Sequence, residues 1–112
     1  MATASSSELD AELVLETLRA LSRTHPELLA GRLAALSLLD PVRREEYMRT
    51  LLAFFDAAGD VGAAASALYV HPNTVRYRLR RLQEITGLDL TDPLQRFVAE
   101  LQLRLTGPDP AA

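Results

Sequence analysis

Side chains with the chemistry of DNA contacts are concentrated between residues 71 and 81. Arginine can donate two parallel hydrogen bonds to O6 and N7 of guanine, and asparagine can pair in the same bidentate way with N6 and N7 of adenine, so Arg76 and Asn73 could read bases. Hydroxyl groups and further guanidinium groups suit phosphate oxygens. The candidate DNA-contacting residues are His71, Pro72, Asn73, Thr74, Arg76, Tyr77, Arg78, Arg80 and Arg81.

A helix over residues 72–86 would sort these groups by face. Pro72 suits the first position of a helix, and Gly87 suits the residue that follows the last turn. Helical periodicity places the aliphatic residues together on one face and the polar residues opposite them. The apolar face holds Val75, Leu79, Leu82 and Thr86, the opposite side holds Asn73, Thr74, Tyr77, Arg80 and Arg81, and Arg76 and Arg78 flank the apolar stripe.

A second, shorter helix is expected just before this one. Residues 61–68 are rich in alanine, which allows another helix to approach closely, and residues 69–71 form a tight connection. Two helices joined in this way make a helix-turn-helix unit, in which the N-terminal residues of the second helix reach the base edges. Asn73 and Arg76 would then read bases, and Arg80 and Arg81 would meet phosphates.

Two of the candidates have a structural alternative. Arg78 borders the apolar stripe, so it can pair with an acidic residue instead of touching DNA. His71 occupies the cap position, so it can cap the helix or contact a phosphate or base. A run of arginines can also be a solvated helix face, but such faces normally carry interleaved acids, and this run has none.

The charge distribution favours a nucleic-acid partner despite a net charge of −3. Residues 1–66 carry six arginines and ten acids, residues 67–83 carry four arginines and no acid, and residues 84–112 carry two arginines and five acids. DNA responds to the local cationic patch rather than to the sum over the chain.

The remaining pattern predicts an all-α helical bundle without strands. Helices are expected over residues 8–23, 26–39, 41–57, 61–68, 72–86 and 93–105, with disordered tails over residues 1–7 and 107–112. Residues 8–39 would form a helical pair that serves as a linker or for dimerisation, and residues 40–106 would form the DNA-binding domain. The expected core includes Leu51, Phe55, Ala65, Leu68, Val75, Leu79 and Leu82, and Leu94, Phe97, Val98, Leu101 and Leu105 form the last apolar stripe.

Other classes of protein are disfavoured. The chain has no cysteine, and its apolar runs are too short to cross a membrane. His25 and His71 lie on different elements, and neither a glycine-rich phosphate loop nor a Ser–His–acid spacing occurs, so we expect no enzyme activity, no metal and no cofactor. The competing hypothesis is a helical protein-interaction or dimerisation module without DNA binding.

Residues 68–79, LYVHPNTVRYRL, resemble the PucR/CdaR-type C-terminal helix-turn-helix domain. That family typically reads L-F/Y-V-H-x-N-T-V/L-x-Y-R-L. The match continues through RRLQEITGLDL at residues 80–90 and then Asp92-Pro93, and the resemblance covers about residues 40–105. Pro72 stands where the family often has a basic residue, which removes one possible DNA contact.

The resemblance implies a Fis-like helix-turn-helix output domain of a bacterial transcription regulator. Such regulators control small-molecule catabolism in the cytoplasm, and their effector would bind a sensor domain that is absent from this chain. Because sensor and central domains do not fit in 112 residues, the chain is expected to be either an excised domain or a short homologue.

A homodimer formed through residues 8–39 is also expected. A single helix-turn-helix unit reads few base pairs, and such units usually act in pairs on half-sites about one helical turn apart. Ala11, Val14, Leu18 and Leu21 form an apolar stripe that could pack against Leu28, Leu33 and Leu36, in the same chain or in a second copy. The alternative is that these helices complete the core of the monomer.

Overall fold

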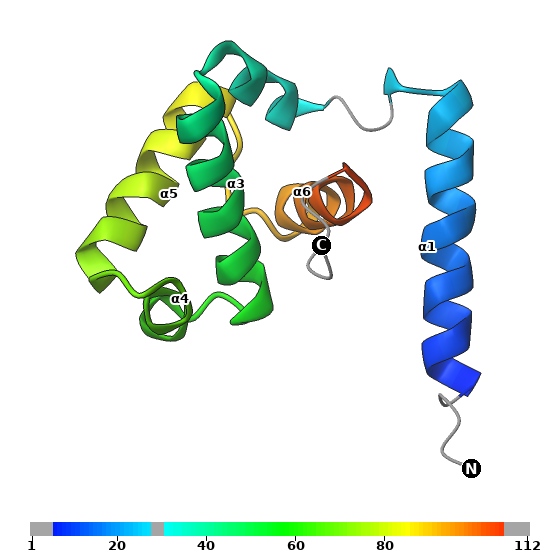
Figure 1. The fold of residues 1–112 in the computed structure, drawn as a ribbon, viewed down its shortest axis with the longest axis horizontal. Coiled ribbons are helices and arrows are strands. Elements are labelled where there is room, and N and C mark those ends of the chain that lie inside the picture. The colour runs from blue at the N-terminus through cyan, green and yellow to red at the C-terminus, as the bar shows by residue number, and fades with distance from the viewer. Residues whose placement is uncertain (1–5, 28–30, 107–112) are drawn as a thin grey trace.

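The computed structural model describes residues 6–27 and 31–106, all of whose regular structure is helical, as predicted (Figure 1). In chain order the elements are α1 (Ser6–Thr24), the 3-10 helix η1 (Arg32–Leu38), α3 (Pro41–Asp56), α4 (Val61–Leu68), α5 (Pro72–Thr86) and α6 (Pro93–Thr106). Most of the two expected tails, residues 1–5 and 107–112, lies outside this range. α1 begins at Ser6, two residues earlier than expected.

The predicted start and stop signals act as expected around α3, α4 and α5. The carboxylate of Asp40 accepts a hydrogen bond from the Arg43 N–H at 3.0 Å, and Asp60 accepts one from the Ala63 N–H at 3.0 Å. Gly87 ends α5 in the left-handed region with φ 73°. Asp60 and Gly87 thus fix the start of α4 and the end of α5, the two helices that carry the candidate site, and both helices span the predicted residues.

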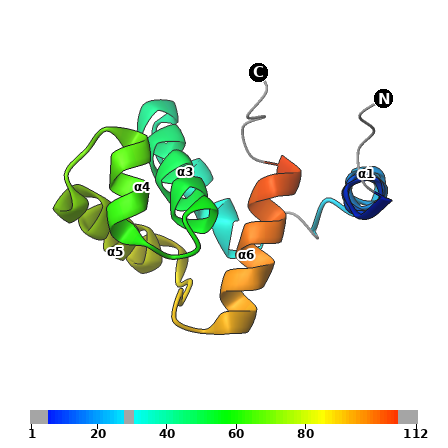
Figure 2. The ribbon, with the colours of Figure 1, turned by 90° about the horizontal axis from the view of Figure 1, so that it is seen from below.

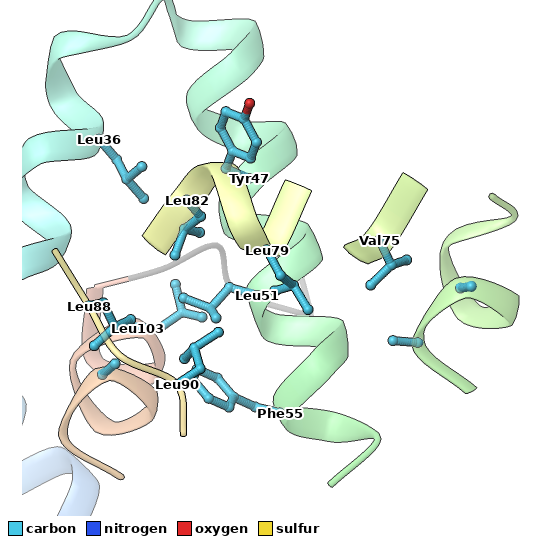
Figure 3. Packing of buried hydrophobic residues seen from close by; sticks show 13 residues of the cluster. Leu36, Tyr47, Leu51, Phe55, Val75, Leu79, Leu82, Leu88, Leu90 and Leu103 are labelled. Atoms are coloured by element: carbon cyan, nitrogen blue, oxygen red, sulfur yellow. The ribbon is translucent and has the colours of Figure 1, made fainter. Parts of the chain in front are cut away.

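The core lies between α3, α4, α5, α6 and η1 (Figure 3). Ala64 and Ala65 of α4 are almost completely buried, which lets α4 pack closely on its neighbours. Of the expected core residues, only Leu68 is half-buried instead of buried. The buried apolar residues are Leu36, Tyr47, Leu51, Phe55, Ala64, Ala65, Val75, Leu79, Leu82, Leu88, Leu90, Ala99 and Leu103.

The expected continuous α-helix over residues 26–39 is not formed. Residues 28–30 lie outside the described part of the chain, Gly31 has φ 43°, and residues 32–38 form a 3-10 helix. A positive φ is incompatible with a right-handed α-helix, so the segment must turn at Gly31. Leu36 is 2% exposed and belongs to the same core as α3 and α5, so packing does not separate residues 8–39 from residues 40–106 at Asp40.

The predicted apolar stripe of α6 is also wrong. Leu94, Phe97 and Val98 are exposed, and the residues that α6 buries are Ala99 and Leu103. A side chain of α6 itself holds this orientation, because Gln95 Oε1 accepts a hydrogen bond of 3.0 Å from the backbone N–H of Asp89 in the preceding turn.

α1 stands apart from α3, α4 and α5, and its main contacts within the described part of the monomer are with α6 (Figures 1 and 2). Its apolar residues Leu9, Leu13, Val14 and Leu21 are exposed, so α1 does not complete the core of the monomer. Arg19 nevertheless reaches α6, where its Nη2 donates to the Arg104 carbonyl at 3.5 Å.

A polar turn connects α5 to α6. The side chains of Thr86 and Gln83 accept hydrogen bonds from the N–H groups of Leu88 and Leu90 at 3.1 and 2.9 Å, so both leucines are buried without loss of these hydrogen bonds. The hydroxyl and the N–H of Thr91 both donate to the carboxylate of Asp89, and these bonds lower the pKa of Asp89.

Arg78 fastens α5 to α3. Its Nη2 forms an ion pair with the carboxylate of Glu46, and its Nη1 donates to Thr50 Oγ1 at 3.5 Å. The Arg78 side chain is only 20% exposed, whereas the exposed fractions in the neighbouring pair of Arg49 and Glu45 are 64% and 55%. Removing one partner of a shielded pair costs more stability than removing one partner of an exposed pair, because the remaining charge is left without a partner where water solvates it poorly.

Replacing Leu79 with alanine should lower the free energy of unfolding by about 2–5 kcal/mol, because a nearly buried leucine would leave a cavity. Urea denaturation measures this. Leu94→Ala is the control, since Leu94 is 70% exposed and its truncation should change stability by less than about 0.5 kcal/mol. Equal effects for the two variants would contradict the described orientation of α5.

Removing Glu46 should destabilise the protein more than removing the adjacent Glu45. Glu46→Ala leaves the half-buried guanidinium of Arg78 without its carboxylate partner, and we expect a loss of about 1–2 kcal/mol. Glu45→Ala breaks only the exposed pair with Arg49 and should lose about 0.5 kcal/mol or less. Thermal unfolding of both variants tests this, and equal losses would show that the Arg78 pair does not anchor α5.

Candidate nucleic-acid interface

Helices α4 and α5 form a helix-turn-helix unit at the end of the molecule opposite α1 (Figures 1 and 2). The turn between them consists of Tyr69, Val70 and His71. Its backbone is closed by a hydrogen bond of 3.0 Å from the Val70 N–H to the Ala65 carbonyl. The sequence-predicted pair of helices is therefore present, with the predicted three-residue connection.

The apolar stripe of α5 decides which side chains face outward. Val75 and Leu82 are completely buried, and Leu79 is 6% exposed. The polar candidates on the other side of the helix are correspondingly accessible, except that Thr74 is half-buried. The exposed candidates on α5 are Asn73, Arg76, Tyr77, Arg80 and Arg81.

The two candidate base-reading residues contact each other. Arg76 Nη1 donates to Asn73 Oδ1 at 2.9 Å, one helical turn away. This bond occupies the amide oxygen of Asn73 and leaves its NH₂ group and the remaining guanidinium donors of Arg76 directed at other acceptors. Both side chains are exposed, so the bond can open at low cost when bases compete for the same groups.

His71 caps α5, which was one of its two expected roles. Its Nδ1 accepts a hydrogen bond from the Asn73 N–H at 3.0 Å. A ring that accepts at Nδ1 carries its proton on Nε2 when neutral, so Nε2–H can still donate to another acceptor. Capping and a DNA contact are therefore compatible. Pro72 occupies the first helical position, where the missing N–H leaves no donor unpaired.

The remaining arginines differ in how their charges are neutralised. Arg78 points toward α3 and pairs with Glu46, which corresponds to the alternative of an acidic partner. Arg81 pairs with Glu84 at 3.0 Å on the exposed surface. Among the residues that the structure describes, Arg80 forms no ion pair and is exposed. Arg80, like Arg76, therefore carries a charge that no carboxylate neutralises within the described residues and that is available to an outside anion.

Tyr69 is an exposed residue of the turn, and it is not among the candidate DNA-contacting residues predicted from the sequence. It lies directly after α4 with φ 57° and ψ 40°, and its side chain is 96% exposed. A tyrosine at a helix C-terminus, where glycine is the usual left-handed residue, is the signal that could have identified it.

Two other kinds of site are absent from residues 6–27 and 31–106. Side chains of histidine and acidic residues form no group of three that could hold a metal ion. In the same ranges, no helix combines the length and the apolar character needed to span a bilayer.

Comparison with known proteins supports the assignment of the helix-turn-helix unit. Residues 47–105 match the family model described as the PucR C-terminal helix-turn-helix domain. No solved structure matches the chain.

Three curated relatives illustrate the similarity. An uncharacterised protein of Mycobacterium tuberculosis is 49% identical over 51 residues, which is 46% of this chain and 12% of that protein. The DNA-binding transcriptional activator AdeR of Bacillus subtilis is 32% identical over 77 residues, 69% of this chain and 18% of AdeR. The purine catabolism regulatory protein of Bacillus subtilis is 34% identical over 61 residues, 54% of this chain and 12% of the regulator.

The chain thus spans less than a fifth of the length of each of these relatives. The family model, in contrast, covers more than half of the chain and includes α4, the turn and α5. The chain belongs to the family of PucR C-terminal helix-turn-helix domains.

Proposed function

We propose that the protein binds double-stranded DNA in a sequence-specific manner, with α5 in the major groove, as the output domain of a transcription regulator. The observation that carries this proposal is the division of α5 into a buried aliphatic face and an exposed face of amide, phenol and guanidinium groups. The major groove admits an α-helix, and its base edges present acceptors and donors that match these groups.

The proposed role of each residue in the interface follows from its position along α5 and from the side chains with which it already pairs. Asn73 and Arg76 lie in the first turns of α5 and read bases, and Arg80 lies further along and binds phosphate. His71, Thr74, Tyr77 and Arg81 contribute polar contacts around them. Arg78 acts on the fold through Glu46 rather than on the DNA.

The regulated process is proposed from the names of relatives. One relative is named a regulatory protein of purine catabolism and another a DNA-binding transcriptional activator. By analogy we infer that this protein controls a small-molecule catabolic pathway, in the bacterial cytoplasm, by binding DNA rather than by catalysis. Because the relatives are much longer than the matched segment, we assign the effector site to a region outside this domain.

DNA binding is tested by measuring affinity for duplexes as a function of salt. Neutralisation of phosphates releases counterions, so the logarithm of the association constant should fall linearly with the logarithm of salt concentration, by about 0.9 per phosphate contacted. Selection from a random duplex library would then give the preferred sequence. A helical interaction module without DNA function would show neither behaviour.

Two alanine variants should separate base reading from phosphate binding. Arg76→Ala should cost about 1–3 kcal/mol of binding free energy and relax the preference at particular base pairs. Arg80→Ala should weaken binding to all duplexes alike and reduce the salt slope by about 1.

Arg96→Ala is the control for these variants, since Arg96 is exposed on α6, outside the helix-turn-helix unit, and its loss should leave affinity and preference unchanged. An unaltered base preference in Arg76→Ala would refute its role in base reading.

We further propose that two copies pair through α1. The exposed stripe of α1 (Leu9, Leu13, Val14 and Leu21) has no counterpart in the described part of the monomer. A single helix with such a stripe gains stability by packing against an apolar partner. α1 lies at the opposite end from α4 and α5, so pairing there leaves both copies of α5 exposed to DNA (Figure 2). Two units on one duplex would read the longer site that specificity requires.

Replacing Leu13 with glutamate should abolish pairing without unfolding the protein, because Leu13 is 64% exposed in the monomer and would be buried in the dimer. Leu38→Glu is the matched control, since Leu38 is 87% exposed on η1. Analytical ultracentrifugation should find dimers for the unmodified chain and for Leu38→Glu, and monomers for Leu13→Glu.

A monomeric unmodified chain, or a dimeric Leu13→Glu variant, would disprove pairing through α1. Point variants are preferable to truncation at Asp40, because truncation would also remove Leu36 from the core.

A further inference from the structure

Tyr69 is the most exposed of the large hydrophobic and aromatic residues in the described part of the chain, at 96%. Its neighbours behave differently, because Leu68 and Val70 are both half-buried against the core. The turn thus directs two aliphatic side chains inward and the tyrosine outward. A solvated ring gains nothing from packing, so burial does not account for a tyrosine at this position.

The backbone at Tyr69 is also unfavourable for this residue type. Its φ of 57° and ψ of 40° lie in the left-handed region, where the Cβ atom of a non-glycine residue is crowded. The hydrogen bonds that close the turn, from the N–H groups of Tyr69 and Val70, involve the backbone alone, and glycine would make them equally well. The chain uses glycine at other positions of positive φ, such as Gly59 and Gly87.

The location of Tyr69 suits a contact with the DNA backbone. It lies two residues before His71, the cap of α5, and so beside the end of α5 that enters the groove in helix-turn-helix proteins. There the walls of the groove are sugars and phosphates. A tyrosine offers a phenol O–H for a phosphate oxygen and a flat ring for the sugar.

We propose that the side chain of Tyr69 is a DNA contact on the sugar–phosphate backbone, which positions α5 in the groove, and that the strained backbone is retained for this contact. The proposal rests on the DNA-binding function proposed above. It predicts opposite effects on stability and on binding for one substitution, because glycine relieves the strain and removes the contact.

The test is Tyr69→Gly in the full chain. We expect its thermal unfolding midpoint to rise by about 4 °C and its affinity for duplex DNA to fall by about 10-fold for preferred and random duplexes alike. Tyr69→Phe keeps the ring and should bind more tightly than Tyr69→Gly. Fluorescence anisotropy with labelled duplexes measures the affinities.

Ala58→Gly is the matched control. Ala58 is the other non-glycine residue of positive φ in the described part of the chain, with φ 53°, and it lies in the turn between α3 and α4. Its replacement should also raise the unfolding midpoint but should leave DNA affinity unchanged. This control separates relief of strain from loss of a contact.

Two results would overturn the proposal. One is a Tyr69→Gly variant that binds DNA as tightly as the unmodified chain, and the other is a Tyr69→Gly variant whose midpoint falls, which would make Tyr69 a structural residue. Failure of the DNA-binding function itself is distinguishable, because the unmodified chain would then show no salt-dependent affinity for any duplex.

Discussion

The contact of the α5 aliphatic stripe with the core is the constraint on which the rest of the molecule depends. Val75, Leu79 and Leu82 can be buried together in only one rotation of the helix about its axis. That rotation leaves Asn73 and Arg76 exposed. Arg78, on the border, is directed to Glu46 by the same rotation, so it reinforces the orientation that the leucines impose. Stability and the candidate DNA surface are therefore two consequences of one packing arrangement.

Fewer positive charges of α5 are available to attract DNA than its number of arginines indicates. Of the four arginines on α5, Arg78 is paired with Glu46 and Arg81 with Glu84, and the whole chain carries a net charge of −3. Long-range steering of such a surface is weak and is screened by salt. The proposed DNA binding would then draw its affinity from directed short-range contacts and, in the proposed dimer, from two copies of α5, and both would require that α5 be held rigidly.

The sequence predicted the boundaries of α4 and α5 correctly, because signals within a few residues determine them. It predicted the buried face of α6 wrongly, because this helix has apolar residues on more than one face. Asp60, Pro72 and Gly87 set the bounds of α4 and α5 by hydrogen bonds and backbone preferences that act within a few residues. The buried face of α6 could not be predicted, because Leu94 and Phe97 look more apolar than Ala99, which the core selects. Glu46, the partner of Arg78, lies on α3 and is far away in sequence. The sequence could therefore predict which residues of α5 are polar, but not which of them pair with acidic residues of other helices.

The Arg104 side chain and carbonyl join the two ends of the molecule. Its guanidinium binds Asp56 of α3 at 2.7 Å and Glu100 at 2.9 Å, and the hydrogen bond to Asp56 raises the pKa of Arg104. Its backbone carbonyl accepts from Arg19 of α1 at 3.5 Å. α3 in turn holds α5 through Glu46 and Arg78. Arg104 therefore connects α1 and α6 to α3 by polar contacts, and the pair of Glu46 and Arg78 connects α3 to α5, in addition to the hydrophobic core that α3, α5 and α6 share.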